Sequence, residues 1–255
     1  MYTVTQRVKQ MKQPRGGFIK SKDYEKKSFS TGIEALHPKE NISPGVIGTT
    51  VDLMTRFLTG KSKYDAFITC MKGAWNILEI EVAEKLLEDI RGLDDHSIIA
   101  ATRLSSFDVF YRTPDYISIR PIESIIPDQD TIENVRIMIK RSVDFLELYG
   151  PKVMDGFSFP HGFSKVIVNG EADYLTTDTL WDLKTSKRGP NKDHWLQLLI
   201  YWRMGLHSIY KDNFVKVKYI GIYNPRLDCV YRYELKKLQK DFLEYLDKTV
   251  IGYEA

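Results

Sequence analysis

Residues 180–185 constrain the fold more than any other part of this sequence. The segment is largely apolar, as a buried β-strand can be, yet it contains Asp182 and Lys184. Strand side chains repeat every second residue, so this carboxylate and this ammonium share one face. A charged pair in a buried strand is costly unless it is paired or binds a metal ion. The alternative is an edge strand with both charges in solvent.

A second acid precedes this strand by about one hairpin. Asp173 follows Gly170 by three positions, and a glycine in a strand permits a bulge or a close backbone approach. We expect Asp173 to lie next to the strand of Asp182. Glu171 shares its face and is a candidate ligand or a solvated neighbour. The alternative is a hairpin with ordinary surface acids.

An amide and a phenol follow on the next predicted helix. Gln197 and Tyr201 are four residues apart and therefore lie on one helix face. Side by side, they can hold a phosphate oxygen or order the nearby lysine. The alternative is that Gln197 stands at the edge of an ordinary apolar core.

An isolated acid occurs much earlier in the chain. A helix is expected to run to Leu58, with Ser43 as N-cap and Pro44 at its first position. Asp52 is its only acid. This segment by itself favours a solvent-facing carboxylate on an amphipathic helix.

Together, these residues resemble the RecB-like branch of the PD-(D/E)XK nuclease superfamily. That branch carries G-x-x-D, D-x-K-T and Q-x-x-x-Y in this order, as do residues 170–173, 182–185 and 197–201 here. It also has an upstream G-x-x-x-His helix, where this chain has Gly48 and then Asp52. The resemblance covers about residues 45–60 and 160–235.

The resemblance implies a restriction-endonuclease-like core and hydrolysis of DNA phosphodiesters with Mg²⁺ or Mn²⁺. It implies that Asp173, Asp182 and the Leu183 carbonyl bind the metal, with Asp52 as third carboxylate because an Asp binds magnesium at least as well as His. Lys184 would orient water or stabilise charge on the phosphate. The residues with expected catalytic roles are Asp173, Asp182, Lys184, Gln197 and Tyr201.

Composition excludes several other classes of function. The two cysteines, Cys70 and Cys229, are too few for a structural zinc site or an iron–sulfur cluster, so the chain resembles the cluster-free relatives. Phosphate-loop and G-x-S-x-G motifs are absent. No apolar run is long enough to span a membrane, and the N-terminus does not resemble a signal peptide, so we expect a cytoplasmic protein that does not enter a membrane.

The first 27 residues are strongly basic, with eight Lys and Arg against two acids and interleaved aromatic residues. Such an arm suits a polyanion, and DNA is the expected partner. The alternative is a solvated, partly disordered terminus. The expected nucleic-acid-binding residues are Arg7, Lys9, Lys12 and Arg15.

The order of predicted elements is helices first, then a small mixed sheet with helices, so the fold class is α/β or α+β. The expected helices are 44–58, 64–78, 79–90, 97–111, 131–149, 193–209 and 235–249, and the expected strands are 165–168, 170–175, 180–185, 215–223 and 229–233. We expect one nuclease domain over residues 1–255, since the Asp52 helix must join the later sheet. Within it lie a basic arm (1–42), a helical region (43–150) and a sheet core (151–255).

The sequence is compatible with two other functions. The same fold can serve as a non-catalytic module that binds nucleic acid or docks a protein partner, although such a module does not need Asp173, Asp182 and Lys184. A nuclease acting on RNA is the weaker possibility. The sequence shows no helicase motor, so processive unwinding would need a helicase or another protein partner.

Overall fold

The computed structural model describes residues 1–29, 35–113 and 121–254. The chain forms two compact units, which are described one at a time. Unit 1 comprises Met1–Phe29 with Leu146–Ala255, and unit 2 comprises Ser30–Phe145. The fold is α+β, with one six-stranded mixed sheet in unit 1, as the sequence predicts. The expectation of one nuclease domain over residues 1–255 stays a prediction.

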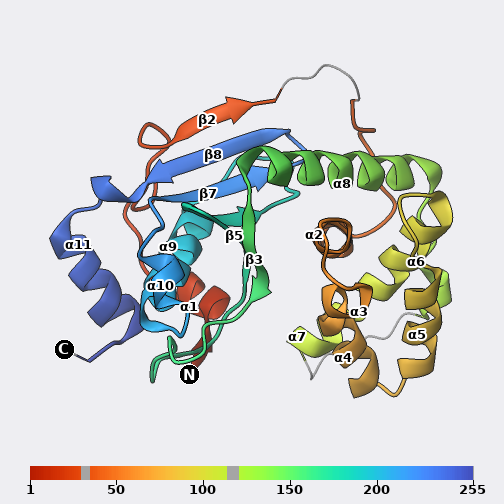
Figure 1. Cartoon of the computed structure of the whole chain (residues 1–255), viewed down its shortest axis with the longest axis horizontal. Helices are drawn as coiled ribbons and strands as arrows, with labels where there is room; N and C mark the ends of the chain where they lie inside the picture. The colour runs from red at the N-terminus through yellow and green to blue at the C-terminus, as the bar shows by residue number, and fades with distance from the viewer. Residues whose placement is uncertain (30–34, 114–120, 255) are drawn as a thin grey trace. The chain divides into compact units, whose positions relative to one another are not determined.

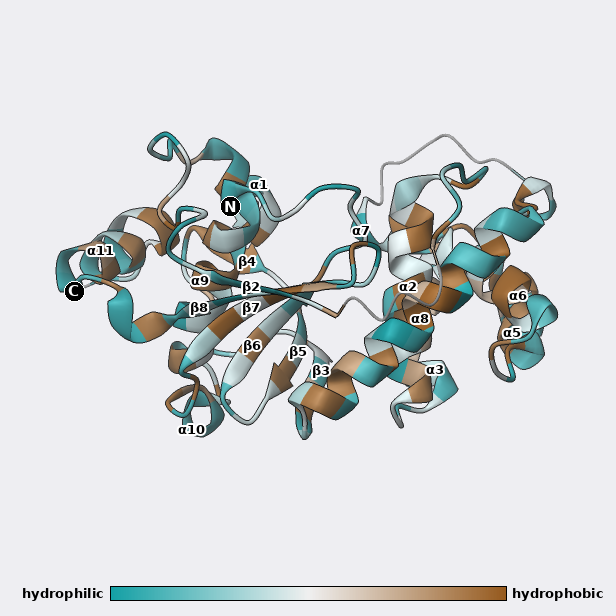
Figure 2. Ribbon diagram, turned by 90° about the horizontal axis from the view of Figure 1, so that it is seen from above, coloured by the Kyte–Doolittle hydropathy of each residue, from teal (hydrophilic) through white to brown (hydrophobic). Residues whose placement is uncertain are grey.

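In the described residues of unit 2, all regular elements are helices. Ser43 caps its first helix, as expected, by accepting a hydrogen bond from the Val46 amide. Figure 2 shows hydrophilic and hydrophobic residues alternating around α8, whose C-terminal turn belongs to unit 1. The elements are α2 (Pro44–Leu58), α3 (Lys63–Ala66), α4 (Ile68–Asn76), α5 (Ile80–Asp89), α6 (Asp95–Ser105), α7 (Asp108–Arg112), the 3₁₀ helix η1 (Ile122–Ser124) and α8 (Gln129–Tyr149).

Unit 1 holds every strand in the described part of the chain (Figure 1). Its strands are β1 (Tyr2–Thr3), β2 (Glu25–Ser28), β3 (Lys152–Phe157), β4 (Ile167–Asn169), β5 (Ala172–Thr176), β6 (Thr179–Leu183), β7 (Tyr219–Asn224) and β8 (Cys229–Glu234). Its helices are α1 (Val4–Gln10), α9 (Lys192–His207), α10 (Lys211–Phe214), η2 (Leu235–Lys237), α11 (Lys240–Tyr245) and the π-helical η3 (Leu246–Ile251).

The main sheet has the strand order β2-β8-β7-β6-β5-β3. Only β6 and β7 are parallel, and all other neighbours are antiparallel. A parallel pair needs a crossover connection, and here α9 and α10 provide it. β1 and β4 form a separate two-stranded parallel pair.

The core of unit 1 lies between α9 and one face of this sheet. Leu180 from β6 and Ile220 from β7 pack there against Leu196 and Leu199 of α9. Strand side chains alternate, so Asp182 and Lys184 lie on the same face as Leu180. The polar residues of β6 therefore face the helix that carries Gln197.

The other face of the sheet carries large aromatic rings. Trp181 packs edge-to-face on Tyr149, and its indole nitrogen donates to the Thr176 hydroxyl at 3.0 Å. Its partner across the parallel ladder is Gly221, where a Cβ atom would lie only 2.2 Å from the indole ring. The glycine is required because the ring occupies the place of a side chain.

The N-terminal segment differs from the expected arm, since residues 1–29 fold into unit 1. Val4 and Val8 of α1 are buried against α9. β2 adds an edge strand to β8, in register from Glu25 opposite Arg232 to Ser28 opposite Cys229. A charged, exposed strand is typical of a protected sheet edge.

Two predicted helices of unit 2 are interrupted. The helix expected over 64–78 breaks at Phe67 (φ −100°, ψ 16°), whose buried ring competes with helical continuation. The helix expected over 97–111 starts earlier, at Asp95, and breaks at Ser106. There the Ser106 hydroxyl donates to the Arg103 carbonyl at 2.6 Å, a local bond that competes with the helical pattern. The sequence also predicts a loop or a short strand over 113–130, because this stretch holds three prolines, and residues 114–120 of it lie outside the described residues.

Several boundaries in unit 1 also differ. β3 was not predicted, and the strand expected from 215 begins at Tyr219, after α10. The helix expected over 235–249 consists of η2, α11 and η3. The helix expected from 193 begins at Lys192, and Asn191 caps it, because the Asn191 side-chain oxygen accepts from the amides of both Asp193 and His194.

The cysteines and the helices bear on two predictions from the sequence. The sequence predicts that Cys70 and Cys229 are reduced core residues, because they are far apart and form no C-x-x-C pattern, and both are buried and free. Among the described helices, none has the length and apolar character to cross a bilayer.

Replacing Gly221 with Ala should lower the free energy of unfolding of unit 1 by about 1–3 kcal/mol, because the added methyl overpacks the Trp181 ring. Thermal unfolding would show a fall in Tm of about 2–4 °C for each kcal/mol. Gly92→Ala is the control, since a Cβ there meets nothing within 4 Å. An unchanged Tm for Gly221→Ala would show that the indole moves aside at no cost.

Candidate active site

The candidate site lies at the carboxyl end of β6, where β5 and β6 separate. Their ladder pairs Tyr174 with Trp181 but does not continue to the next residues. In its place the Asp173 carboxylate accepts a hydrogen bond from the Leu183 amide at 2.8 Å. Asp173 therefore lies next to the strand of Asp182, as the sequence predicts.

The backbone of Leu183 also points toward this carboxylate. The Lys184 amide donates to the Tyr223 carbonyl of β7 at 2.9 Å, and successive residues of a strand direct their polar groups to opposite neighbours. The N–H and C=O of Leu183 thus face β5 and Asp173. This orientation suits the expected role of the Leu183 carbonyl as a neutral ligand.

Asp182 and Lys184 form an ion pair on the face covered by α9. The Lys184 ammonium lies 2.7 Å from the Asp182 carboxylate. The Asp182 side chain is 3% exposed, whereas that of Lys184 is 27% exposed. The carboxylate is thus held inside the protein, and the ammonium is partly accessible. The alternative of an edge strand with both charges in solvent is wrong for Asp182, because β6 is an interior strand.

Gln197 and Tyr201 lie side by side on α9, as expected. The Gln197 amide donates to the Tyr201 hydroxyl oxygen at 3.0 Å. Burial raises the pKa of Tyr201 far above its ordinary value, although the Gln197 hydrogen bond opposes this shift. The negative charges of Asp182, Asp173 and Glu171 raise it further. Tyr201 is therefore a neutral phenol in the field of three carboxylates.

Gly170 allows the chain before β5 to lie against the Tyr201 ring of α9. A Cβ atom there would lie 2.7 Å from Val4 and 3.0 Å from the Tyr201 ring. The backbone before β5 can approach α9 this closely only because residue 170 has no side chain. The glycine and the tyrosine, which are 31 positions apart in the printed sequence, are thus in contact.

His194 is a neighbour of the site that the sequence motifs do not indicate. Burial and the positive charge of Lys184 lower its pKa to about 4, while Asp193 opposes the shift. Its Nδ1 faces the Asn191 amide at 3.4 Å, which requires a neutral ring. Its position three residues before Gln197 is the only sequence signal for it.

The remaining expected residues are distributed differently. Asp52 lies on α2 in unit 2, where its carboxylate pairs with Arg56 at 2.6 Å, so its role as third carboxylate stays a prediction. Arg7 donates to the carbonyls of Val250 and Thr249 at the end of η3. Lys9 and Lys12 are exposed, and Arg15 lines a surface pocket.

The acids do not form a dense cluster. Within residues 1–29, 35–113 and 121–254, no three His, Cys, Asp or Glu side chains are close enough together to hold a metal ion. The available set at β6 is therefore two carboxylates and one backbone carbonyl. Comparison of the chain with family models, curated proteins and solved structures finds no match.

The pKa of His194 predicts a specific pH dependence of stability. The unfolded histidine binds a proton below about pH 6.5, whereas the folded one stays neutral to about pH 4. The neutral histidine therefore makes its full contribution to the free energy of unfolding above pH 6.5, and this contribution is lost as the pH drops from 6.5 to 4. His194→Gln should flatten this part of the profile in urea titrations. A difference in the free energy of unfolding between wild type and variant at pH 7.5 measures the lost cap contact. If the variant loses stability between pH 6.5 and 4 as steeply as the wild type, His194 is not the group responsible.

Proposed function

We propose that this protein hydrolyses DNA phosphodiester bonds with Mg²⁺ or Mn²⁺ at the carboxyl end of β6. The observation that carries the proposal is the buried Asp182, ion-paired to a partly exposed Lys184, with the Asp173 carboxylate on the adjacent strand 2.8 Å from the Leu183 amide. Acids, a lysine and a backbone carbonyl at one point are suited to a divalent cation and a phosphate.

The residues present fit a magnesium-type ion. Mg²⁺ is commonly bound through one or two carboxylates and retains several waters. Asp173, Asp182 and the Leu183 carbonyl would hold it, and the negative charge near Tyr201 favours a cation at this place. When bound, the ion would polarise the phosphate and lower the pKa of a bound water.

The other side chains would act on the phosphate and the attacking water. Lys184 supplies a positive charge that is both anchored by Asp182 and partly exposed, so it can orient water or stabilise charge on the phosphate. Tyr201 is protonated and accepts from Gln197, so it still has a proton to donate. Gln197 would hold that phenol in place.

The resemblance to the RecB-like PD-(D/E)XK nucleases supports the same proposal, because residues of its three motifs act on one another. Asp173 accepts from the Leu183 amide, and the charges of Asp173 and Asp182 act on Tyr201. We propose DNA as the substrate, with RNA as the weaker choice. A non-catalytic nucleic-acid-binding or partner-docking module is the alternative from another class.

Asp182→Asn and Lys184→Gln should each reduce cleavage by at least about 10²-fold, because each removes a charge from the reacting centre. Labelled single- and double-stranded DNA, linear and circular, and matched RNA would be incubated with Mg²⁺, Mn²⁺ or EDTA. Asp212→Asn, on an exposed position of α10, is the control and should retain full activity. Cleavage of the circular substrate would identify an endonuclease.

Full activity of Asp182→Asn would contradict the proposed role of Asp182. Salt-sensitive DNA binding without cleavage by the wild type under any metal condition would favour the binding module.

Mn²⁺ or Mg²⁺ should raise the Tm of the wild type, since a ligand that binds only the folded state stabilises it by about 2.7 kcal/mol at 100 times its Kd. The shift should be lost in the Asp173→Asn, Asp182→Asn double variant, with each protein compared with its own sample in EDTA. Differential scanning fluorimetry provides the measurement. An equal shift in the double variant would place the metal elsewhere.

A further inference from the structure

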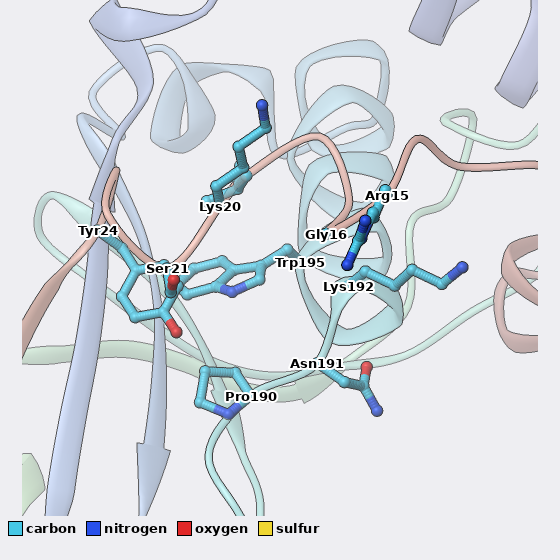
Figure 3. Close-up of a pocket in the computed structure, with 10 residues that line it drawn as sticks. Arg15, Gly16, Lys20, Ser21, Tyr24, Pro190, Asn191, Lys192 and Trp195 are labelled. Carbon is cyan, nitrogen blue, oxygen red and sulfur yellow. The ribbon is translucent and has the colours of Figure 1, made fainter.

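A basic pocket lies at the N-terminus of α9, next to the candidate site. Its volume is about 560 Å³, and it is formed within unit 1 by residues 15–24 and 190–195. Figure 3 shows Trp195 in its wall, with Tyr24 on one side and Arg15 and Lys192 on the other. The loop from Lys184 leads directly to Pro190 and Asn191 at its lower edge.

The two sides of the pocket are held together by specific contacts. Gly16 and Gly17 have φ angles of 83° and 82°, which favour glycine. A Cβ at Gly17 would lie 2.6 Å from Lys192 Cβ, so the turn approaches α9 as closely as a backbone can. The Gln13 amide also donates to the Asp193 carboxylate at 2.7 Å. The pocket is therefore a built feature of the fold.

The charge of the pocket is positive. Among its ten lining residues are the three cations Arg15, Lys20 and Lys192, and there is no acid. Asp193 and Asp23, which are next to lining residues in the chain, accept hydrogen bonds from the protein: Asp193 accepts from Gln13, and Asp23 accepts from the Lys20 amide. All three cations are exposed, and their long side chains can turn toward a bound anion.

A buried hydrogen-bond donor also belongs to the pocket. Trp195 is 2% exposed, and its indole nitrogen has no acceptor among the described residues. Figure 3 shows this nitrogen on the side of the ring that faces Pro190. Buried polar groups are generally hydrogen-bonded, so an unsatisfied donor in a basic pocket indicates a missing acceptor.

We propose that this pocket binds a phosphate group of the DNA strand whose phosphodiester lies at β6. The assignment of DNA as ligand rests on the proposed function. A polymer with a phosphate at each nucleotide can occupy both places, whereas a small anion cannot. The three cations would contact the phosphate, the Trp195 N–H would donate to one of its oxygens, and Tyr24 offers an aromatic ring beside it.

The test uses the Asp182→Asn chain, so that binding is measured without cleavage. Arg15, Lys20 and Lys192 are all changed to Gln, and a matched variant carries Gln at the exposed Lys211, Lys216 and Lys240, which lie elsewhere in unit 1. Fluorescence anisotropy with a labelled single-stranded oligodeoxynucleotide is recorded at several NaCl concentrations.

The pocket variant should bind at least about tenfold more weakly, and the slope of log Kd against log [NaCl] should fall by roughly 0.7, the value for the loss of one phosphate contact on a single strand. The matched variant should change Kd by less than about threefold. Equal losses in the two variants would overturn the proposal, since general charge alone would then explain binding.

Trp195→Phe tests the buried donor. It keeps an aromatic ring but removes the N–H, so binding should weaken severalfold while the salt slope stays the same. An unchanged Kd would overturn the assignment of this indole.

The proposed hydrolysis and the proposed pocket can fail separately. If the wild type does not cleave DNA but the pocket variant binds DNA more weakly than the matched variant, hydrolysis is refuted and the pocket assignment stands. Cleavage together with equal losses in both triple variants would do the reverse.

Discussion

The parallel pairing of β6 with β7 is the constraint on which the rest of unit 1 depends. A parallel pair requires a crossover, and this crossover is α9. The connection takes the chain from the carboxyl end of β6 into the N-terminus of α9 and then across one face of the sheet. As a result, Asp182, Gln197 and Tyr201 come from one continuous stretch of chain, and the Asp182 charge and the Gln197 amide both act on the Tyr201 phenol.

That arrangement explains how a carboxylate can be buried at Asp182. An isolated buried charge is strongly unfavourable, and removing one partner of a buried pair is costly. Here Lys184 stays close through its own strand, since side chains two apart share a face, and the backbone bond to Tyr223 holds it in position. The lysine remains partly exposed, so a ligand at the surface can reach its ammonium group while the Asp182 carboxylate stays buried.

The basic N-terminal segment acquires a different meaning in the folded chain. It is not simply an appended arm, because α1 packs on α9, β2 closes the sheet edge and the turn at Gly17 contacts Lys192. The positive charge is thereby placed at the start of α9, close to the loop that leaves Lys184. Both proposed sites thus use the same helix. The phosphate pocket lies at the N-terminus of α9, and the hydrolytic site uses Gln197 and Tyr201 further along it.

The sequence by itself determined features that depend on local periodicity. The shared face of Asp182 and Lys184, the contact of Gln197 with Tyr201, and the caps and turns around α2 follow from repeats of two or 3.6 residues and from Ser43 and Pro44. Most strands near the motifs were predictable for the same reason. The breaks at Phe67 and Ser106 were not, because burial and a side-chain hydrogen bond prevailed over local helix preference.

Only the tertiary structure decided which distant segments meet. The bond from Leu183 to Asp173, the contact of Gly170 with Tyr201, and the pairing of β2 with β8 join residues that no local pattern connects. The pocket depends on a contact between Gln13 and Asp193, 180 positions apart. Such contacts arise from the close packing of elements already formed, so they depend on the three-dimensional register of the sheet and not on the periodicity of any one segment.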